Sequence, residues 1–179
     1  MKGIRDFSQD LFNYLLDVDF MDKDSHFMFE AIKEAEKSLD EGGIPIGAVL
    51  VSNDKIISKG HNRMVQEDSP ILHAEMDAIN NAGRLSSKEY ESLTLYTTLS
   101  PCPMCSGAVV LYNIPRVVIG DNITLMGAES FLMDNNVDVK VLNLKEASDV
   151  FNKLLDKDPN LWKRELDRVE NSTDVKKID

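Results

Sequence analysis

The only two cysteines of the chain, Cys102 and Cys105, stand three residues apart behind Pro101 and a run of strand-forming residues. If a helix begins at Cys102, positions i and i+3 project to the same side of it, so both thiols point toward one spot. A single Cys-x-x-Cys pair in a protein without secretory features indicates metal binding or redox chemistry rather than a structural disulfide. The pattern therefore predicts a metal site or a thioredoxin-like redox site at this turn.

His73 and Glu75 supply what a catalytic metal site needs besides two thiolates. A histidine nitrogen and two sulfurs leave the fourth position of a tetrahedral Zn²⁺ open to water or hydroxide, and zinc lowers the pKa of that water to about 7. Glu75, two residues beyond His73, could accept the proton without being a ligand. His-x-Glu followed by Pro-Cys-x-x-Cys is the signature of zinc deaminases. The redox alternative leaves both residues without a use.

The elements that must position these side chains follow from hydrophobic periodicity and from glycine and proline. Helices are predicted over 25–40 (with Ser25 as N-cap), 73–82, 102–113, 128–134, 147–155 and, after an interruption at Pro159, 162–168. Strands are predicted over 46–52, 55–60, 93–99, 116–120 and 138–143, the first two forming a hairpin. Because helical crossovers join parallel strands, we expect a three-layer α/β/α fold with a mixed five-stranded sheet and helices on both faces.

Composition divides the chain into one domain and two flanking segments. We expect a single catalytic domain over 25–168, including a C-terminal lid helix, and a polar tail over 169–179. Residues 1–24 read as an N-terminal extension, in which Leu11, Phe12, Leu15 and Leu16 form a short amphipathic pattern. That pattern predicts a helix packed on the domain or on a partner subunit.

The charge and hydropathy of the chain argue against two classes of partner. The net charge is −11, from 20 basic and 31 acidic residues, whereas nucleic-acid binding normally needs a basic face. No apolar run approaches the roughly 20 residues of a membrane helix, and the first residues lack the apolar core of a signal peptide. We therefore expect a soluble, cytoplasmic protein with a small neutral substrate and no membrane partner.

Over residues 27–162 the chain resembles the zinc-dependent cytidine deaminase superfamily, and within it the free-base cytosine deaminases of fungal type. The resemblance is carried by GGIPIG at 42–47, GHN at 60–62, HAE at 73–75, GRL at 83–85, LYTTLSPC at 95–102, GA at 107–108, IPRVV at 114–118 and GDN at 120–122. It implies strand order 2-1-3-4-5, one catalytic zinc per subunit and a homodimer. It also implies hydrolysis of cytosine to uracil and ammonia, a reaction of pyrimidine salvage.

The resemblance assigns roles to residues of this sequence. His73, Cys102 and Cys105 would hold zinc, and Glu75 would move a proton from water to the ring nitrogen and then to the leaving amine. The side chain of Asn62 would hydrogen-bond the edge of the base. The further residues that it places at the substrate are Ile46, Ala74 and Leu99.

The C-terminal lid departs from the family pattern. Trp162 is present, but Glu165 stands where the family has aspartate, Asp167 follows two positions later, and Leu125 replaces an aromatic lid residue. The identity of the base therefore stays open between cytosine and another amino-heterocycle such as isocytosine, guanine or a triazine. The tRNA adenosine deaminases share the core motifs, although the acidic charge and the lid argue against a polynucleotide. A zinc-stabilised interaction protein without activity would have no need of Glu75.

Overall fold

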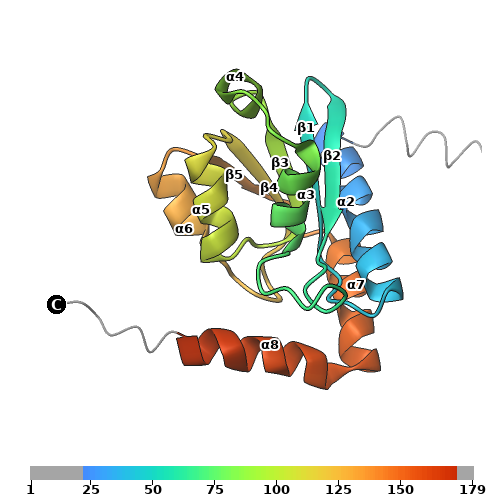
Figure 1. The fold of residues 1–179 in the computed structure, drawn as a ribbon. Helices are drawn as coiled ribbons and strands as arrows, with labels where there is room; N and C mark the ends of the chain where they lie inside the picture. Colours follow the sequence, from blue (N-terminus) through green and yellow to red (C-terminus); the bar gives the residue numbers. More distant parts are fainter. Residues whose placement is uncertain (1–21, 173–179) are drawn as a thin grey trace, which may run out of the picture.

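A five-stranded mixed sheet forms the middle layer of the molecule (Figure 1), in a computed structural model that describes residues 22–172, with side chains to Asp167. Its strands are β1 (Gly47–Ser52), β2 (Lys55–His61), β3 (Thr94–Leu99), β4 (Arg116–Asp121) and β5 (Asp138–Val141). The order is β2-β1-β3-β4-β5; β1 is antiparallel to β2 and β3, and β3, β4 and β5 are parallel. The predicted fold class and strand order are confirmed.

Helices cover both faces of the sheet (Figure 1). The helices α3 (Ala74–Ala82), α5 (Pro103–Leu111) and α6 (Glu129–Asp134) contribute to one apolar core, and α2 (Lys23–Asp40) and α7 (Lys145–Lys157) contribute to the other. The helix α8 (Pro159–Ser172) crosses one end of the molecule, next to a third apolar cluster.

The side chains of β1 show why the sheet needs helices on both sides. Successive residues of a strand point to opposite faces. Ala48 and Leu50 therefore belong to the core beside α3 and α5, whereas Val49 and Val51 belong to the core beside α2. All four are buried, as expected of a central strand whose sequence reads as a continuous apolar run.

The start of the domain differs from the prediction. The N-cap of α2 is Asp22 rather than Ser25, because Asp22 Oδ1 accepts the backbone N–H groups of Asp24 at 2.7 Å and Ser25 at 3.3 Å. Asp24, assigned above to the extension, is buried and pairs with Arg116 at 2.8 Å and Lys140 at 2.6 Å. These ion pairs tie the first turn of α2 to β4 and β5. The predicted helix around Leu11 lies outside the described residues.

Two further helix predictions need correction. The chain breaks between α7, which ends at Lys157, and α8, as expected, but Pro159 itself is the first residue of α8 rather than Trp162. A proline at the first helical position has no N–H to leave unpaired. The helix continues to Ser172, four residues beyond the predicted end. The short helix α4 (Ser87–Tyr90) was not predicted, although Ser86 and Glu89 form a capping box that marks its start.

No helix among residues 22–172 is long and apolar enough to cross a membrane.

Candidate active site

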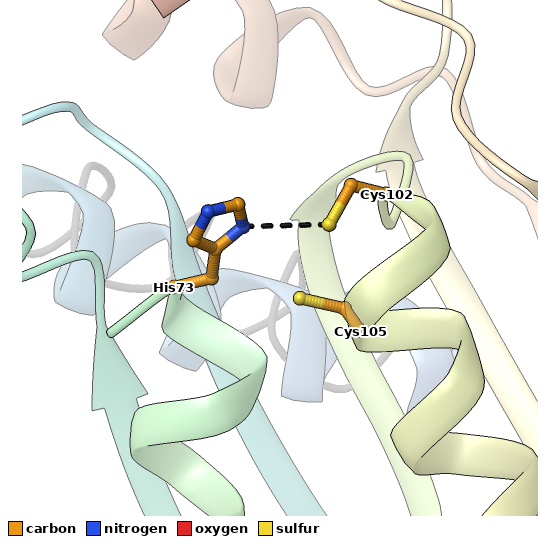
Figure 2. Close-up of side chains that lie close together, drawn as sticks. All are labelled: His73, Cys102 and Cys105. Atoms are coloured by element: carbon orange, nitrogen blue, oxygen red, sulfur yellow. Dashed lines mark hydrogen bonds between the residues drawn. The ribbon is translucent and has the colours of Figure 1, made fainter. Parts of the chain in front are cut away.

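The starts of two helices bring the predicted ligands together. His73 is the N-cap of α3 and Cys102 is the N-cap of α5, whose first turn contains Cys105. The three side chains point toward one another (Figure 2), and Cys102 Sγ lies 3.5 Å from His73 Nδ1. One ligand atom from each residue lies within 4.8 Å of the others. Within the described part of the chain, this is the one group of His, Cys, Asp and Glu side chains close enough to hold a metal ion.

This donor set fits zinc. Zinc bonds of about 2.0–2.1 Å to nitrogen and 2.3 Å to sulfur at a tetrahedral angle put the two ligand atoms about 3.6 Å apart, close to the 3.5 Å between His73 and Cys102. Helix N-termini also favour thiolates over thiols. Three protein ligands are typical of catalytic zinc sites, which keep a position for water or substrate.

Interactions among the three side chains shift the pKa values of Cys102 and Cys105 in opposite directions. A hydrogen bond from Cys105, which outweighs the effect of burial, and a further one with His73 lower the pKa of Cys102 to about 4. The same bond to Cys102, together with burial, raises the pKa of the Cys105 thiol. Burial acts to lower the pKa of His73. Its hydrogen bond to Cys102 and the negative charge of the Cys102 thiolate outweigh burial, so the pKa of His73 is raised. The lowered pKa of Cys102 favours the thiolate that a metal ligand needs, whereas the raised pKa of Cys105 favours its thiol until a metal displaces the proton.

Glu75 lies directly beside the ligands. Its side chain is almost fully buried; Oε1 accepts a hydrogen bond from Thr97 Oγ1 at 3.2 Å, and Oε2 accepts one from Cys105 at 3.3 Å. Burial raises the pKa of the Glu75 carboxyl, which suits a group that must both accept and release a proton near neutral pH.

A mainly apolar pocket of about 280 Å³ opens over this group, at the small end of the range of about 300–1,000 Å³ for ligand pockets. His73, Glu75 and Cys102 line it, as do six predicted substrate residues, Ile46, Asn62, Leu99, Leu125, Trp162 and Glu165. The side chain of Ala74, also predicted at the substrate, does not line the pocket. It is fully buried in the core with α5 and β1. Cys105 lies below the pocket rather than in its wall.

Asn62 is held with its amide nitrogen available. Its Oδ1 accepts the backbone N–H of Met64 at 3.1 Å, and its backbone N–H bonds to Ile46 O at 2.9 Å. Among the described residues, no hydrogen bond occupies Asn62 Nδ2. The side chain is therefore a fixed donor at the pocket rather than a freely rotating amide.

The C-terminal helix α8 forms one wall of the pocket. The Trp162 ring packs edge-on against Phe151 of α7, with ring centroids 4.8 Å apart. Glu165 lines the pocket and lies close enough to His73 to raise its pKa, whereas Asp167 is not among the lining residues. Of the two carboxylates after Trp162, Glu165 is the one at the pocket.

Sequence reasoning missed several residues of the wall. Most of them sit on loops or on α8, where no periodic pattern indicates their direction; they are Ile44, Met64, Ser100, Pro103, Met126, Gly127 and Leu166. It also missed Thr97, whose hydroxyl holds Glu75. Ser100 had a usable signal, since it immediately precedes the Pro-Cys-x-x-Cys motif.

His73, Cys102 and Cys105 are called the metal group below. The fold and this metal group together define a zinc-dependent deaminase. Residues 21–121 match the family model of the cytidine and deoxycytidylate deaminase zinc-binding region, and the chain belongs to this family. It is a zinc-dependent hydrolytic enzyme, and His73, Cys102 and Cys105 are a group of side chains that could hold the metal ion.

Individual relatives fall into two groups. The cytosine deaminase of Candida albicans is 46% identical over 137 residues, covering 76% of this chain and 91% of the relative. The tRNA-specific adenosine deaminase of Bacillus subtilis is 50% identical over 101 residues, covering 56% of this chain and 63% of the relative. A solved structure from work on tRNA:A34 deaminases, which edit A to I at the wobble position, has a TM-score of 0.60 and 29% identity, over 70% of this chain and 99% of the other.

Proposed function

We propose that the enzyme deaminates a free amino-substituted nucleobase, with cytosine as the first candidate, so that cytosine and water give uracil and ammonia. The observation that carries the proposal is the small apolar pocket with Glu75 and the metal group at one end and Asn62 and Glu165 in its walls. The similarity to the Candida cytosine deaminase, which extends over most of both chains, supports the same substrate class.

His73, Cys102 and Cys105 would hold the zinc ion, which when bound supplies a water acidic enough to act as a nucleophile near neutral pH. The Glu75 carboxylate takes one proton of the attacking water and gives it to the ring nitrogen next to the amino-bearing carbon. It then takes the second proton of that water from the new hydroxyl group and delivers it to the amine, which leaves as ammonia when the C–N bond breaks and the carbonyl forms. Thr97 keeps this carboxylate in place through its bond to Oε1. One residue thus acts as base and then as acid.

The edges of the base are matched by polar groups of opposite kinds. Asn62 Nδ2 is a donor and suits the carbonyl oxygen of cytosine, because Asn62 Oδ1 already accepts the Met64 N–H. Glu165 is an acceptor and suits a ring N–H. The remaining wall is apolar and excludes water from the reacting centre.

A polynucleotide substrate has less support. The net charge of −11 repels phosphates, and Trp162, Glu165 and Leu166 of α8 form part of the pocket wall. The tRNA deaminase of Bacillus subtilis nevertheless shares half of its aligned residues with this chain, so tRNA belongs among the substrates tested.

The proposed substrate predicts the outcome of an ammonia-release panel of cytosine, isocytosine, guanine, cytidine, adenosine and tRNA. We expect kcat/KM for cytosine to exceed that for cytidine, adenosine and tRNA by at least about 100-fold, since losing a buried polar match or adding a ribose to a closed pocket costs that much. A kcat/KM for isocytosine, guanine or tRNA above that for cytosine would show that cytosine is not the preferred substrate.

The same panel measured on Glu165→Ala tests the lid carboxylate. We expect kcat/KM on the preferred base to fall about 10- to 100-fold, the equivalent of one hydrogen bond to a charged group. Asp167→Ala is the matched control, because Asp167 follows on the same helix without lining the pocket. If Glu165→Ala had the same kcat/KM as Asp167→Ala, Glu165 would not be a substrate-binding residue.

We also propose a homodimer formed by the face of α3 and α5. Leu111 is 73% exposed at the end of α5, and next to it Tyr112 stacks on Tyr90 with ring centroids 4.7 Å apart. The two tyrosines line a hollow on this face, whose lining also includes apolar Met76, Ile79 and Leu85 and polar Asn80 and Arg84. A second copy is the partner that such a face suits, because isologous contacts let one apolar patch bury its own equivalent.

Sedimentation equilibrium should therefore give twice the mass of one 20.1 kDa chain. Leu111→Glu should shift the mass to that of the monomer, because it places a charge in the proposed contact. Ile57→Glu is the control, since Ile57 is also exposed but lies on β2, the edge strand. A monomeric wild type, or loss of the dimer only in Ile57→Glu, would contradict this face.

A role in pyrimidine salvage in the cytoplasm completes the proposal. Free cytosine is a salvage substrate, and uracil is its reusable product. The use of two cysteine thiols as metal ligands suits a reducing compartment.

A further inference from the structure

We propose that Ser100 and Glu129 are positioning residues of the pocket, which hold the loop after β4 against the segment that carries Cys102. The inference rests on the proposed function only in naming the pocket as the substrate site. Neither residue is a metal ligand or the proton carrier, and both side chains are engaged with the loop rather than with the metal group.

The Ser100 hydroxyl connects three parts of the chain. Its side chain is buried, Oγ donates to Glu129 Oε1 at 2.8 Å, and Oγ accepts the backbone N–H of Gly127 at 2.9 Å. Its backbone N–H bonds to Asp121 O at 3.0 Å, at the end of β4. One residue between β3 and the metal-binding helix thus holds both ends of the loop.

Glu129 extends this connection. Its second oxygen, Oε2, accepts from Asn122 Nδ2 at 3.3 Å. Asn122 is the first residue of the loop and Glu129 is the first residue of α6, so the carboxylate bridges the loop's beginning and its end. A charged acceptor makes such bonds stronger than those between neutral groups.

Gly127 allows the loop to lie close to the metal-binding segment. A Cβ at this position would stand 2.2 Å from Pro101 O, which is too close for any side chain. Pro101 O in turn accepts the backbone N–H of Ala128 at 2.8 Å. The loop is therefore in direct backbone contact with the residue before Cys102.

Other contacts also hold the loop: Asp121 Oδ1 accepts the backbone N–H of Ile123 at 2.8 Å, and Leu125 packs on the third apolar cluster. Ile123 is 81% exposed and Met126 is 69% exposed, so few apolar contacts fix its position. Yet Leu125, Met126 and Gly127 line the pocket. A segment with few buried contacts has low local stability unless hydrogen bonds hold it. The bonds of Ser100 and Glu129 therefore help to fix where this wall of the pocket stands.

The test uses the zinc-loaded, full-length chain in four variants. Ser100→Ala and Glu129→Ala remove the connection, Glu129→Gln keeps an acceptor for the Ser100 hydroxyl, and Ser58→Ala is the control. Ser58 is also a buried serine with one hydrogen bond, to Ala78 O at 2.7 Å, but it lies on β2 away from the loop.

We expect hydrogen exchange of the Gly127 and Ala128 amides to become about tenfold faster in Ser100→Ala and Glu129→Ala, because local opening loses one or two hydrogen bonds. On the preferred base, KM should rise about fivefold with kcat changed less than about twofold, since the wall contacts the base equally in the ground and transition states. Glu129→Gln, which keeps an acceptor for Ser100 but not for Asn122, should lie between the wild type and Glu129→Ala, and Ser58→Ala should match the wild type in both measurements.

Two results would overturn the inference. Unchanged amide exchange in both alanine variants would show that these bonds do not hold the loop. A fall in kcat together with loss of zinc would assign Ser100 to the support of Cys102 instead. A wild type inactive on every base would contradict the proposed function alone, and the exchange rates would still decide this inference.

Discussion

Replacing Glu75 by glutamine is expected to abolish ammonia release while zinc content stays near one ion per subunit. General acid–base catalysis contributes about 10²- to 10⁴-fold per proton transfer, and Glu75 carries out two in succession. We therefore expect kcat to fall by at least about 10³-fold. Glutamine has nearly the same volume and can still accept the hydrogen bond from Thr97 Oγ1, so the pocket and the ligands should keep their positions.

Metal analysis and steady-state kinetics on the same sample distinguish loss of chemistry from loss of zinc. Glu67→Gln is a suitable control, because Glu67 is exposed and its carboxylate bonds to Arg63 at 2.6 Å, away from the ligands. This control should keep wild-type activity. Retention of more than about a tenth of kcat in Glu75→Gln would refute the proton-carrying role.

Removing one metal ligand should greatly lower both the zinc affinity and the Tm. Cys105 is fully buried, and Cys105→Ser replaces a thiolate by a hydroxyl that stays protonated. Zinc affinity should fall more than the 10- to 100-fold that follows loss of a group that merely supports a ligand. Zinc at 100 times its Kd stabilises the folded state by about 2.7 kcal/mol. In a domain of this size, losing that binding should lower Tm by about 5–10 °C.

Chelation provides an internal check on this expectation. Treating the wild type with a strong chelator should lower Tm by a similar amount, with recovery when zinc is returned, whereas the Cys105→Ser protein should not respond. Ser106→Ala is the matched control, since Ser106 is the next buried residue of α5 and loses only a bond to Pro101 O at 3.3 Å. A Cys105→Ser protein that binds zinc as tightly as the wild type would show that Cys105 is not a ligand.

Strong local signals explain why most of the fold was predictable. All five strands were predicted, because the central ones are nearly continuous apolar runs bounded by turn residues. The failures lie where local and distant interactions compete. Ser25 is a good N-cap by residue type, but Asp22 takes that role. Asp24 is buried only because Arg116 and Lys140, about 100 residues away, pair with it.

The metal group was determined by the sequence itself. Its ligands depend on residue type and on spacing within one helical turn, and those features are local: Cys102 and Cys105 share the start of α5, and His73 and Glu75 share the start of α3. Once a parallel sheet is expected, the two helix starts must face the same end of it. The chemistry of the zinc site therefore required no knowledge of side-chain packing.

The remaining parts of the pocket wall were decided by the tertiary structure. Met126 and Gly127 reach the pocket because the loop after β4 packs on the segment of Ser100 and Pro101, and no spacing rule predicts such a contact between segments. The choice of Glu165 over Asp167 depends on which side of α8 faces the pocket, which is set by the packing of Trp162 on Phe151. Zinc chemistry comes from short-range geometry, whereas substrate selection comes from surfaces that meet only in the folded chain.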